Sequence, residues 1–298
     1  MAQPSESKEF IEFQKWRTKS QKGKLETIDC ISTWTDVCGF GNLLQTNSWD
    51  LNKLSKSKVL ELLNEVYTIA GRVFLPNVEP FPSDKILVLN DGIAKTVDFK
   101  YKNRLDGYSF LFFLRDSIIN HYILLDITER FDVGIRTIFA GGERVQYSPI
   151  KMTGESILYY NEDNISEHGK KMLGTQFLYN PAEFQMNTAF AKAFTIDTLG
   201  SKERIFVNGL YIEDSFLKLI SEIPKIKIQN SANEIDISYK STLMFRLNIR
   251  ETLLKEMKGL KVKSSTLTNA SFSKNLMVTT WNLVYLGKKV KAANTLYK

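Results

Sequence analysis

Two aspartates, Asp36 and Asp91, stand at points where the chain is expected to turn sharply. The segment "TWTDVCGFGN" places Asp36 at the end of an apolar run and shortly before two glycines. Asp91 belongs to "LVLNDGIAKTV", and its Asp-Gly step is typical of tight hairpin turns. Carboxylate and carbonyl oxygens are the ligands that Mg²⁺ and Mn²⁺ prefer. If the two turns meet, Asp36, Asp91 and the carbonyl oxygen of Val37 form a candidate site for one or two such cations.

The order of the predicted elements would bring these two turns together. Strand, helix, hairpin, helix and strand are predicted over residues 27–37, 54–75, 85–100, 108–130 and 132–142. This order is typical of an α/β (α+β) fold with a ferredoxin-like or palm-type sheet and both helices on one face. In such a sheet the first strand lies beside the hairpin, so Asp36 should approach Asp91. Each aspartate alone is equally typical of an ordinary turn, so the hypothesis depends on the pair.

The turn after Asp36 has features of a phosphate-binding loop. Gly39 and Gly41 would let the backbone bend around a triphosphate, with Phe40 between them. Backbone N–H groups in such a bend can donate to phosphate oxygens. We therefore expect Gly39, Phe40 and Gly41 to contact a nucleotide.

Composition limits the other possibilities. The chain has 298 residues, 43% of them hydrophobic and 12% aromatic, which is ample for a packed core. The chain has two histidines and no Cys-x-x-Cys pair, which argues against a zinc site. His121 sits in an apolar helix and is predicted to be structural. Cys30 and Cys38 flank one strand and lie too far apart along it for a disulfide. No long apolar segment or apolar signal core occurs, so a cytoplasmic protein with no membrane partner is expected.

Charge is distributed unevenly along the chain. We expect an N-terminal tail over residues 1–25, a main domain over 26–210 with an insertion at about 148–179, and a basic extension over 211–298. The extension holds 15 Lys and Arg against 7 Asp and Glu, whereas the first 210 residues hold 25 and 26. Such an excess is compatible with a nucleic-acid partner, but dispersed lysines are more typical of a solvated surface.

Four segments resemble the class III nucleotidyl cyclases, in the order in which that family carries them. They are "DVCGFG", "LVLNDGIAKTV", "DVGIRTIFAGGE" and "FQMNTAFAKAFTIDTLGSKERIFV", and together they extend from Ile28 to Val207. The first two match the family's metal-binding segments, each with its aspartate. The resemblance implies a cyclase-type fold and a divergent bacterial member of the family.

The resemblance also implies an activity and further residues. Asp36, Val37 and Asp91 would bind two Mg²⁺ or Mn²⁺ ions, and the 3′-hydroxyl of a nucleoside triphosphate would attack its α-phosphate. The products would be a 3′,5′-cyclic nucleotide and pyrophosphate. Asn187 falls where the family orients the ribose, and Lys192 lies next to the position of its catalytic arginine. Such sites are completed across a head-to-tail homodimer, and free-standing bacterial relatives act in antiphage (antiviral) signalling.

Two departures from the family pattern keep alternatives open. The position of the catalytic arginine holds Ala191, and the lysine that follows lacks the planar fork of arginine. The position that selects the purine base holds Leu87. Three hypotheses follow: a divergent cyclase with an unusual base preference, a catalytically degenerate nucleotide-binding or scaffold protein, and a nucleic-acid-binding protein that uses the basic C-terminal third.

Overall fold

The computed structural model describes residues 8–56, 58–71, 84–99, 104–145, 183–257 and 259–273. Contacts divide the chain into two compact units, Met1–Ile28 with Glu143–Thr188, and Asp29–Gly142 with Ala189–Lys298. The predicted insertion lies wholly outside the described residues. Within the described part of the chain, no helix is long and apolar enough to cross a membrane.

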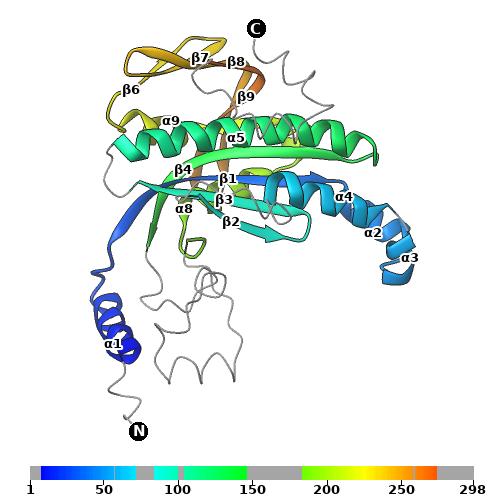
Figure 1. Cartoon of the computed structure of the whole chain (residues 1–298), viewed down its shortest axis with the longest axis horizontal. Coiled ribbons are helices and arrows are strands. Elements are labelled where there is room, and N and C mark those ends of the chain that lie inside the picture. Colours follow the sequence, from blue (N-terminus) through cyan, green and yellow to red (C-terminus); the bar gives the residue numbers. More distant parts are fainter. Residues whose placement is uncertain are drawn as a thin grey trace. The chain divides into compact units, whose positions relative to one another are not determined.

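Nine strands form one mixed, mostly antiparallel sheet in the order β2-β3-β1-β4-β5-β9-β8-β7-β6 (Figure 1). Their bounds are β1 (Thr27–Cys38), β2 (Asp84–Leu89), β3 (Gly92–Phe99), β4 (Gly134–Val145), β5 (Leu210–Glu213), β6 (Ile226–Asn230), β7 (Glu234–Tyr239), β8 (Thr242–Met257) and β9 (Leu260–Phe272). β3 pairs antiparallel with both β1 and β2, so the first predicted strand does lie beside the predicted hairpin. The mixed α/β class expected from the sequence is therefore confirmed.

The structure describes helices in both units, and those of the larger unit lie on both faces of this sheet. Their bounds are α1 (Lys8–Gln21), α2 (Phe40–Thr46), α3 (Leu51–Lys56), α4 (Val59–Val66), α5 (Arg104–Glu129), α8 (Thr188–Asp197) and α9 (Asp214–Ser221). Because side chains alternate along a strand, odd-numbered β1 residues such as Ile31 and Val37 pack with α4 and α5. Even-numbered Trp34 instead contacts Phe190 of α8. The two predicted helices thus share one face, and α8 covers the other.

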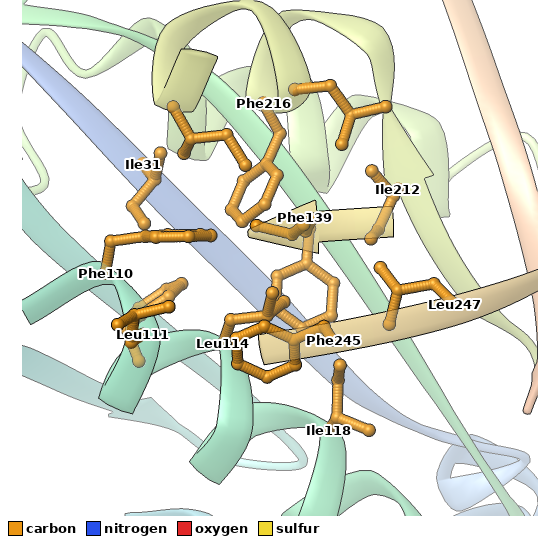
Figure 2. Packing of buried hydrophobic residues seen from close by; sticks show 14 of the residues in the cluster. Ile31, Phe110, Leu111, Leu114, Ile118, Phe139, Ile212, Phe216, Phe245 and Leu247 are labelled. Atoms are coloured by element: carbon orange, nitrogen blue, oxygen red, sulfur yellow. The ribbon is translucent and has the colours of Figure 1, made fainter. Parts of the chain in front are cut away.

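The larger core cluster lies between α5, α9 and the sheet. Figure 2 shows Phe110 and Leu114 of α5 among Phe139 of β4, Phe216 of α9 and Phe245 of β8. The rings of Phe139 and Phe216 meet edge to face with their centroids 5.4 Å apart. Fully burying a Phe side chain contributes about 1.5–3 kcal/mol, so this cluster is a main source of stability.

Residues 210–273 continue the same sheet, a placement that the sequence analysis did not make. β5 runs parallel to β4 and antiparallel to β9, and β9, β8, β7 and β6 follow as antiparallel neighbours. The alternation in "EIDISY" is visible in β7, where Ile235, Ile237 and Tyr239 are buried and the residues between them are not. Lys240 and Ser241, both with positive φ, form the tight turn into β8.

The helix predicted over residues 54–75 is divided in the structure. α3 and α4 are separate, and a π-helical turn, Tyr67–Gly71, follows α4. The hydroxyl of Thr68 donates to the carbonyl oxygen of Asn64 at 2.7 Å, a bond that competes with the regular helical ladder. Ser55 lies inside α3, and its hydroxyl donates to the carbonyl oxygen of Asn52 at 2.9 Å.

Candidate functional site

The end of β1 and the tip of the β2–β3 hairpin are joined by backbone pairing. Asp36 is the register partner of Gly92, and the N–H of Val37 donates to the carbonyl oxygen of Asp91 at 3.1 Å. Asn90 and Asp91 form the two-residue turn, and Asn90 has a φ of 53°. The two turns that carry the aspartates therefore meet at one end of the sheet, as the order of elements predicted.

Two glycines make this arrangement possible. A Cβ atom on Gly92 would lie 2.0 Å from Cη2 of Trp34, so only glycine leaves room for the indole ring beside the hairpin tip. Gly39 has a φ of 95°, which lets the chain leave β1 and enter α2 directly. The hydroxyl of Tyr67 also donates to the carbonyl oxygen of Asn90 at 2.5 Å, which fixes the hairpin tip from the side of the π-helical turn.

Asp197, at the C-terminal end of α8, is a third carboxylate near Asp36, and the sequence analysis missed it. The pKa of Asp36 is raised to about 7, first by burial and then by the negative charges of Asp197 and Asp91. Burial is also the main reason why the pKa values of Asp91 and Asp197 are raised. Because neighbouring negative charges disfavour ionisation, a positive charge at this end of the sheet would stabilise the three ionised carboxylates.

Arg136 of β4 supplies positive charge from within the protein. Its Nη1 donates to the backbone carbonyl oxygens of Asp197 at 3.0 Å and Ile205 at 3.3 Å. Its Nη2 donates to the sulfur of Cys38 at 3.0 Å. Its Nε lies 3.1 Å from Oδ1 of Asp197, an ion pair between two mostly buried side chains that lacks hydrogen-bond geometry. The guanidinium thus connects β4, α8 and the end of β1.

Trp34 and Cys38 complete the surroundings of the three carboxylates. The indole Nε1 of Trp34 is buried and faces Asp197, whose pKa it lowers, although it lacks strict hydrogen-bond geometry. The Cys38 thiol lies 4.0 Å from the backbone carbonyl oxygen of Asp36. Burial raises the pKa of Cys38 to about 12, so this thiol stays neutral and is a poor nucleophile. Neither Cys30 nor Cys38 is part of a disulfide, as expected.

A buried polar network lies on the opposite face of β1. The hydroxyls of Thr35 and Thr137 are 3.2 Å apart, and Thr137 is 3.1 Å from Nδ1 of His121. Burial lowers the pKa of His121 to about 3, so the imidazole is neutral at ordinary pH. The network links β1, β4 and α5, in agreement with the structural role predicted for His121.

The remaining predicted site residues are placed as follows. Gly41 lies in α2 and has open space around it, whereas Phe40 is 2% exposed and packs in the apolar cluster with Val37. The ammonium group of Lys192 donates to the carbonyl oxygen of Gly141 at 3.0 Å. It lines a groove of about 650 Å³ between α9 and the β8–β9 hairpin. Among the described residues, the structure brings together Asp36, Val37 and Asp91, and it places Lys192 in this separate groove.

Asn187 belongs to the other compact unit. Its side chain is buried and its Nδ2 donates to the carbonyl oxygen of Glu183 at 2.8 Å. Asn187 also forms an isolated antiparallel bridge with Arg144. Its role toward a ribose stays a prediction. Leu87, at the position that selects the base in the family, is a buried residue of β2 opposite Ala94.

The donor set fits one hard divalent cation better than a larger cluster. Over the described ranges, no group of three or more His, Cys, Asp or Glu side chains is arranged to hold a metal ion. Asp36 and Asp91 are oxygen donors with raised pKa values, and binding a cation would relieve their mutual repulsion. Asp197 is directed toward the guanidinium of Arg136 instead.

Comparison with known proteins gives a distant likeness among solved structures. No protein-family model matches the chain, and no curated protein matches it either. Among solved structures, the guanylyl cyclase Cya2 matches with a TM-score of 0.47 and 10% sequence identity. That match covers 85% of this chain and 98% of the cyclase. It is a likeness of fold alone.

Proposed function

We propose that this protein is a divergent nucleotidyl cyclase that converts a nucleoside triphosphate to a 3′,5′-cyclic nucleotide and pyrophosphate. The observation that carries the proposal is the register of β1 and β3, which pairs Asp36 with Gly92 and places Asp91 beside it. Two carboxylates at one end of a sheet are the minimum that a cation-dependent phosphoryl transfer needs from the protein. We propose cytoplasmic action and a nucleoside triphosphate as the partner.

Each residue of the site has a defined part in this proposal. Asp36, Asp91 and the carbonyl oxygen of Val37 would hold Mg²⁺ or Mn²⁺. When bound, such a cation makes a hydroxyl more acidic and neutralises the charge on a leaving pyrophosphate. Backbone N–H groups at Gly39–Gly41 would orient the phosphates. Arg136 restrains the end of β1 through Cys38, so that the carboxylate of Asp36 keeps one position.

Asn187 and Lys192 would act on the substrate in a head-to-tail homodimer. Asn187 would orient the ribose, and Lys192 would neutralise charge on the phosphates in place of the family's arginine. Within one copy the ammonium of Lys192 is bonded to Gly141, so this role requires the ammonium to leave that carbonyl oxygen. A lysine supplies a point charge without the bidentate geometry of arginine, so slower turnover is expected.

The proposal is tested by incubating the purified protein with each of the four nucleoside triphosphates and Mn²⁺, with products separated by mass. A cyclic mononucleotide should form and should disappear in Asp91→Asn. Asp126→Asn, which removes an exposed carboxylate of α5, is the matched control and should retain turnover. Absence of product from every nucleotide, in a protein shown to be folded, would contradict the proposal. An antiphage role would require that a protective effect in phage-infected bacteria is lost in the same Asp91→Asn variant.

A second candidate function is cation-dependent nucleotide binding without turnover. It is favoured by the bond between Lys192 and Gly141 and by Ala191 at the position of the family's arginine. It predicts that a nucleotide binds in the presence of Mn²⁺, that Asp91→Asn weakens this binding, and that no product forms. Nucleic-acid binding is less favoured, since Lys255 is paired with Glu203 at 2.6 Å and Lys263 lies 3.6 Å from Asp214. It would show as steeply salt-dependent binding that is indifferent to Asp91.

A further inference from the structure

Arg136 is a fixed internal cation and not a mobile surface charge. Each nitrogen of its guanidinium faces an acceptor in the protein: Nη1 faces two carbonyl oxygens, Nη2 faces the sulfur of Cys38, and Nε faces Oδ1 of Asp197. Arg136 is only 7% exposed. A guanidinium held on all sides in this way is not available to swing out and bind a phosphate.

The charge of Arg136 acts on the same carboxylates that would bind a divalent cation. Cys38 lies between Arg136 and Asp36. Its sulfur accepts from Nη2 of Arg136 and lies 4.0 Å from the backbone carbonyl oxygen of Asp36. The carboxylate of Asp197, in turn, is paired with the guanidinium.

The balance of charge at this end of the sheet limits how many cations the protein can hold. With all three carboxylates ionised, they and the one guanidinium carry a net charge of −2, which one divalent cation neutralises. A second divalent cation would leave a partly buried site with a net charge of +2 before any nucleotide arrives, and such an uncompensated charge is strongly disfavoured. The arrangement of the donors agrees, because of the three carboxylates Asp36 and Asp91 remain for a cation when Asp197 is paired with Arg136.

We propose that Arg136 takes the place of a second cation, so that the protein binds one divalent ion between Asp36 and Asp91 with Asp197 serving only as the partner of Arg136. This inference rests on the proposed function, since it concerns the same cation site. It differs from the two-ion site that the resemblance implies. Arg136 and Asp197 are therefore positioning residues that determine the stoichiometry of the site and do not contact the ion.

The test measures the number of Mn²⁺ ions bound to the whole protein without nucleotide, by electron paramagnetic resonance of free Mn²⁺. The wild-type protein should bind one ion, and Asp91→Asn should abolish binding. Arg136→Gln removes the internal charge and releases Asp197, so Mn²⁺ should bind about tenfold more tightly or with a second ion. Arg136→Lys keeps the charge and should keep one ion.

Asp197→Asn decides between a positioning residue and a ligand even if Arg136→Gln fails to fold. Loss of a ligand would abolish binding as Asp91→Asn does, whereas loss of the partner of Arg136 should weaken binding by no more than about tenfold. Two ions on the wild-type protein, abolished by Asp91→Asn, would overturn this inference and leave the proposed function standing. Binding of no Mn²⁺ to the folded wild-type protein would overturn both.

Discussion

The backbone N–H of Val37 donates to the carbonyl oxygen of Asp91 at 3.1 Å, and this bond joins the end of β1 to the tip of the β2–β3 hairpin. Fifty-four positions separate the two residues in sequence, yet backbone pairing holds them together. This pairing fixes the backbone positions of Asp36 and Asp91, which carry the two carboxylates. Substitutions that disturb the backbone pairing should therefore weaken both stability and cation binding. Substitutions that only remove a charge should change cation binding without the same loss of stability.

Gly92→Ala tests the close contact at the hairpin tip. The added Cβ would lie 2.0 Å from Cη2 of Trp34, and the indole ring is also in contact with the rings of Phe190 and Phe194 of α8. We expect a loss of about 1–3 kcal/mol in the free energy of unfolding, measured by urea denaturation. Gly41→Ala is the control, because a Cβ there meets nothing within 4 Å, and it should leave stability within about 1 kcal/mol. Equal stability of the two variants would contradict the packing described for Trp34.

Asp36→Asn tests whether the ionised carboxylate of Asp36 destabilises the folded protein. The folded state raises the pKa of Asp36 to about 7, so folding favours its protonated form. This contribution to stability is fully present below the unfolded-state value of about 4 and is lost as the pH rises through 7. The wild-type protein should therefore be less stable at pH 8 than Asp36→Asn, by about 1–2 kcal/mol.

Adding Mn²⁺ at pH 8 should reverse that order. The ion should raise the melting temperature of the wild-type protein and leave that of Asp36→Asn unchanged, since a ligand stabilises only the form that binds it. An ion 100-fold above its dissociation constant would contribute about 2.7 kcal/mol. The same effect of Mn²⁺ on both proteins would indicate that Asp36 is not a ligand.

His121→Gln tests the buried network behind β1, where the dependence on pH has the opposite sign. The folded state lowers the pKa of His121 to about 3, so the unfolded chain binds its proton first. Stability is fully present above the unfolded-state value of about 6.5 and falls by up to about 1.4 kcal/mol per pH unit as the pH decreases toward 3. The difference in unfolding free energy between wild type and His121→Gln, measured from pH 7 to 4, should shrink as the pH falls. A constant difference would mean that the folded state does not lower the pKa of His121.

A double-mutant cycle tests the ion pair between Arg136 and Asp197. Arg136→Met leaves a mostly buried carboxylate without its partner and should cost about 3 kcal/mol of stability. The double variant with Asp197→Asn should recover part of that loss, because no uncompensated charge remains. The exposed pair of Arg130 and Glu65 is the comparison, and breaking it should cost less than about 1 kcal/mol. Additive effects of Arg136→Met and Asp197→Asn would show that the two side chains do not interact.

Much of the fold was predictable because it depends on local patterns. The Asn-Asp-Gly step predicted the β2–β3 hairpin, since few residues other than Asn, Asp and Gly adopt the positive φ that such turns need. The long apolar segment of α5 and the β-branched segment of β1 were identified for similar reasons. The π-helical turn after α4 was missed, because a hydroxyl that bonds back to a carbonyl, as Thr68 does to Asn64, leaves no periodic signal.

The sequence by itself determined the order of elements, and that order places Asp36 beside Asp91 in any sheet of this type. Only the tertiary structure decided which other residues surround them. Arg136 and Asp197 lie in a strand and a helix whose packing brings their side chains together from 61 positions apart, and nothing in either local sequence marks the contact. Residues 210–273 join the same sheet for a comparable reason, since strand partners are chosen by long-range pairing and by burial against a shared core. Local patterns thus specified the turns that carry the aspartates, and packing specified the charges that act on them.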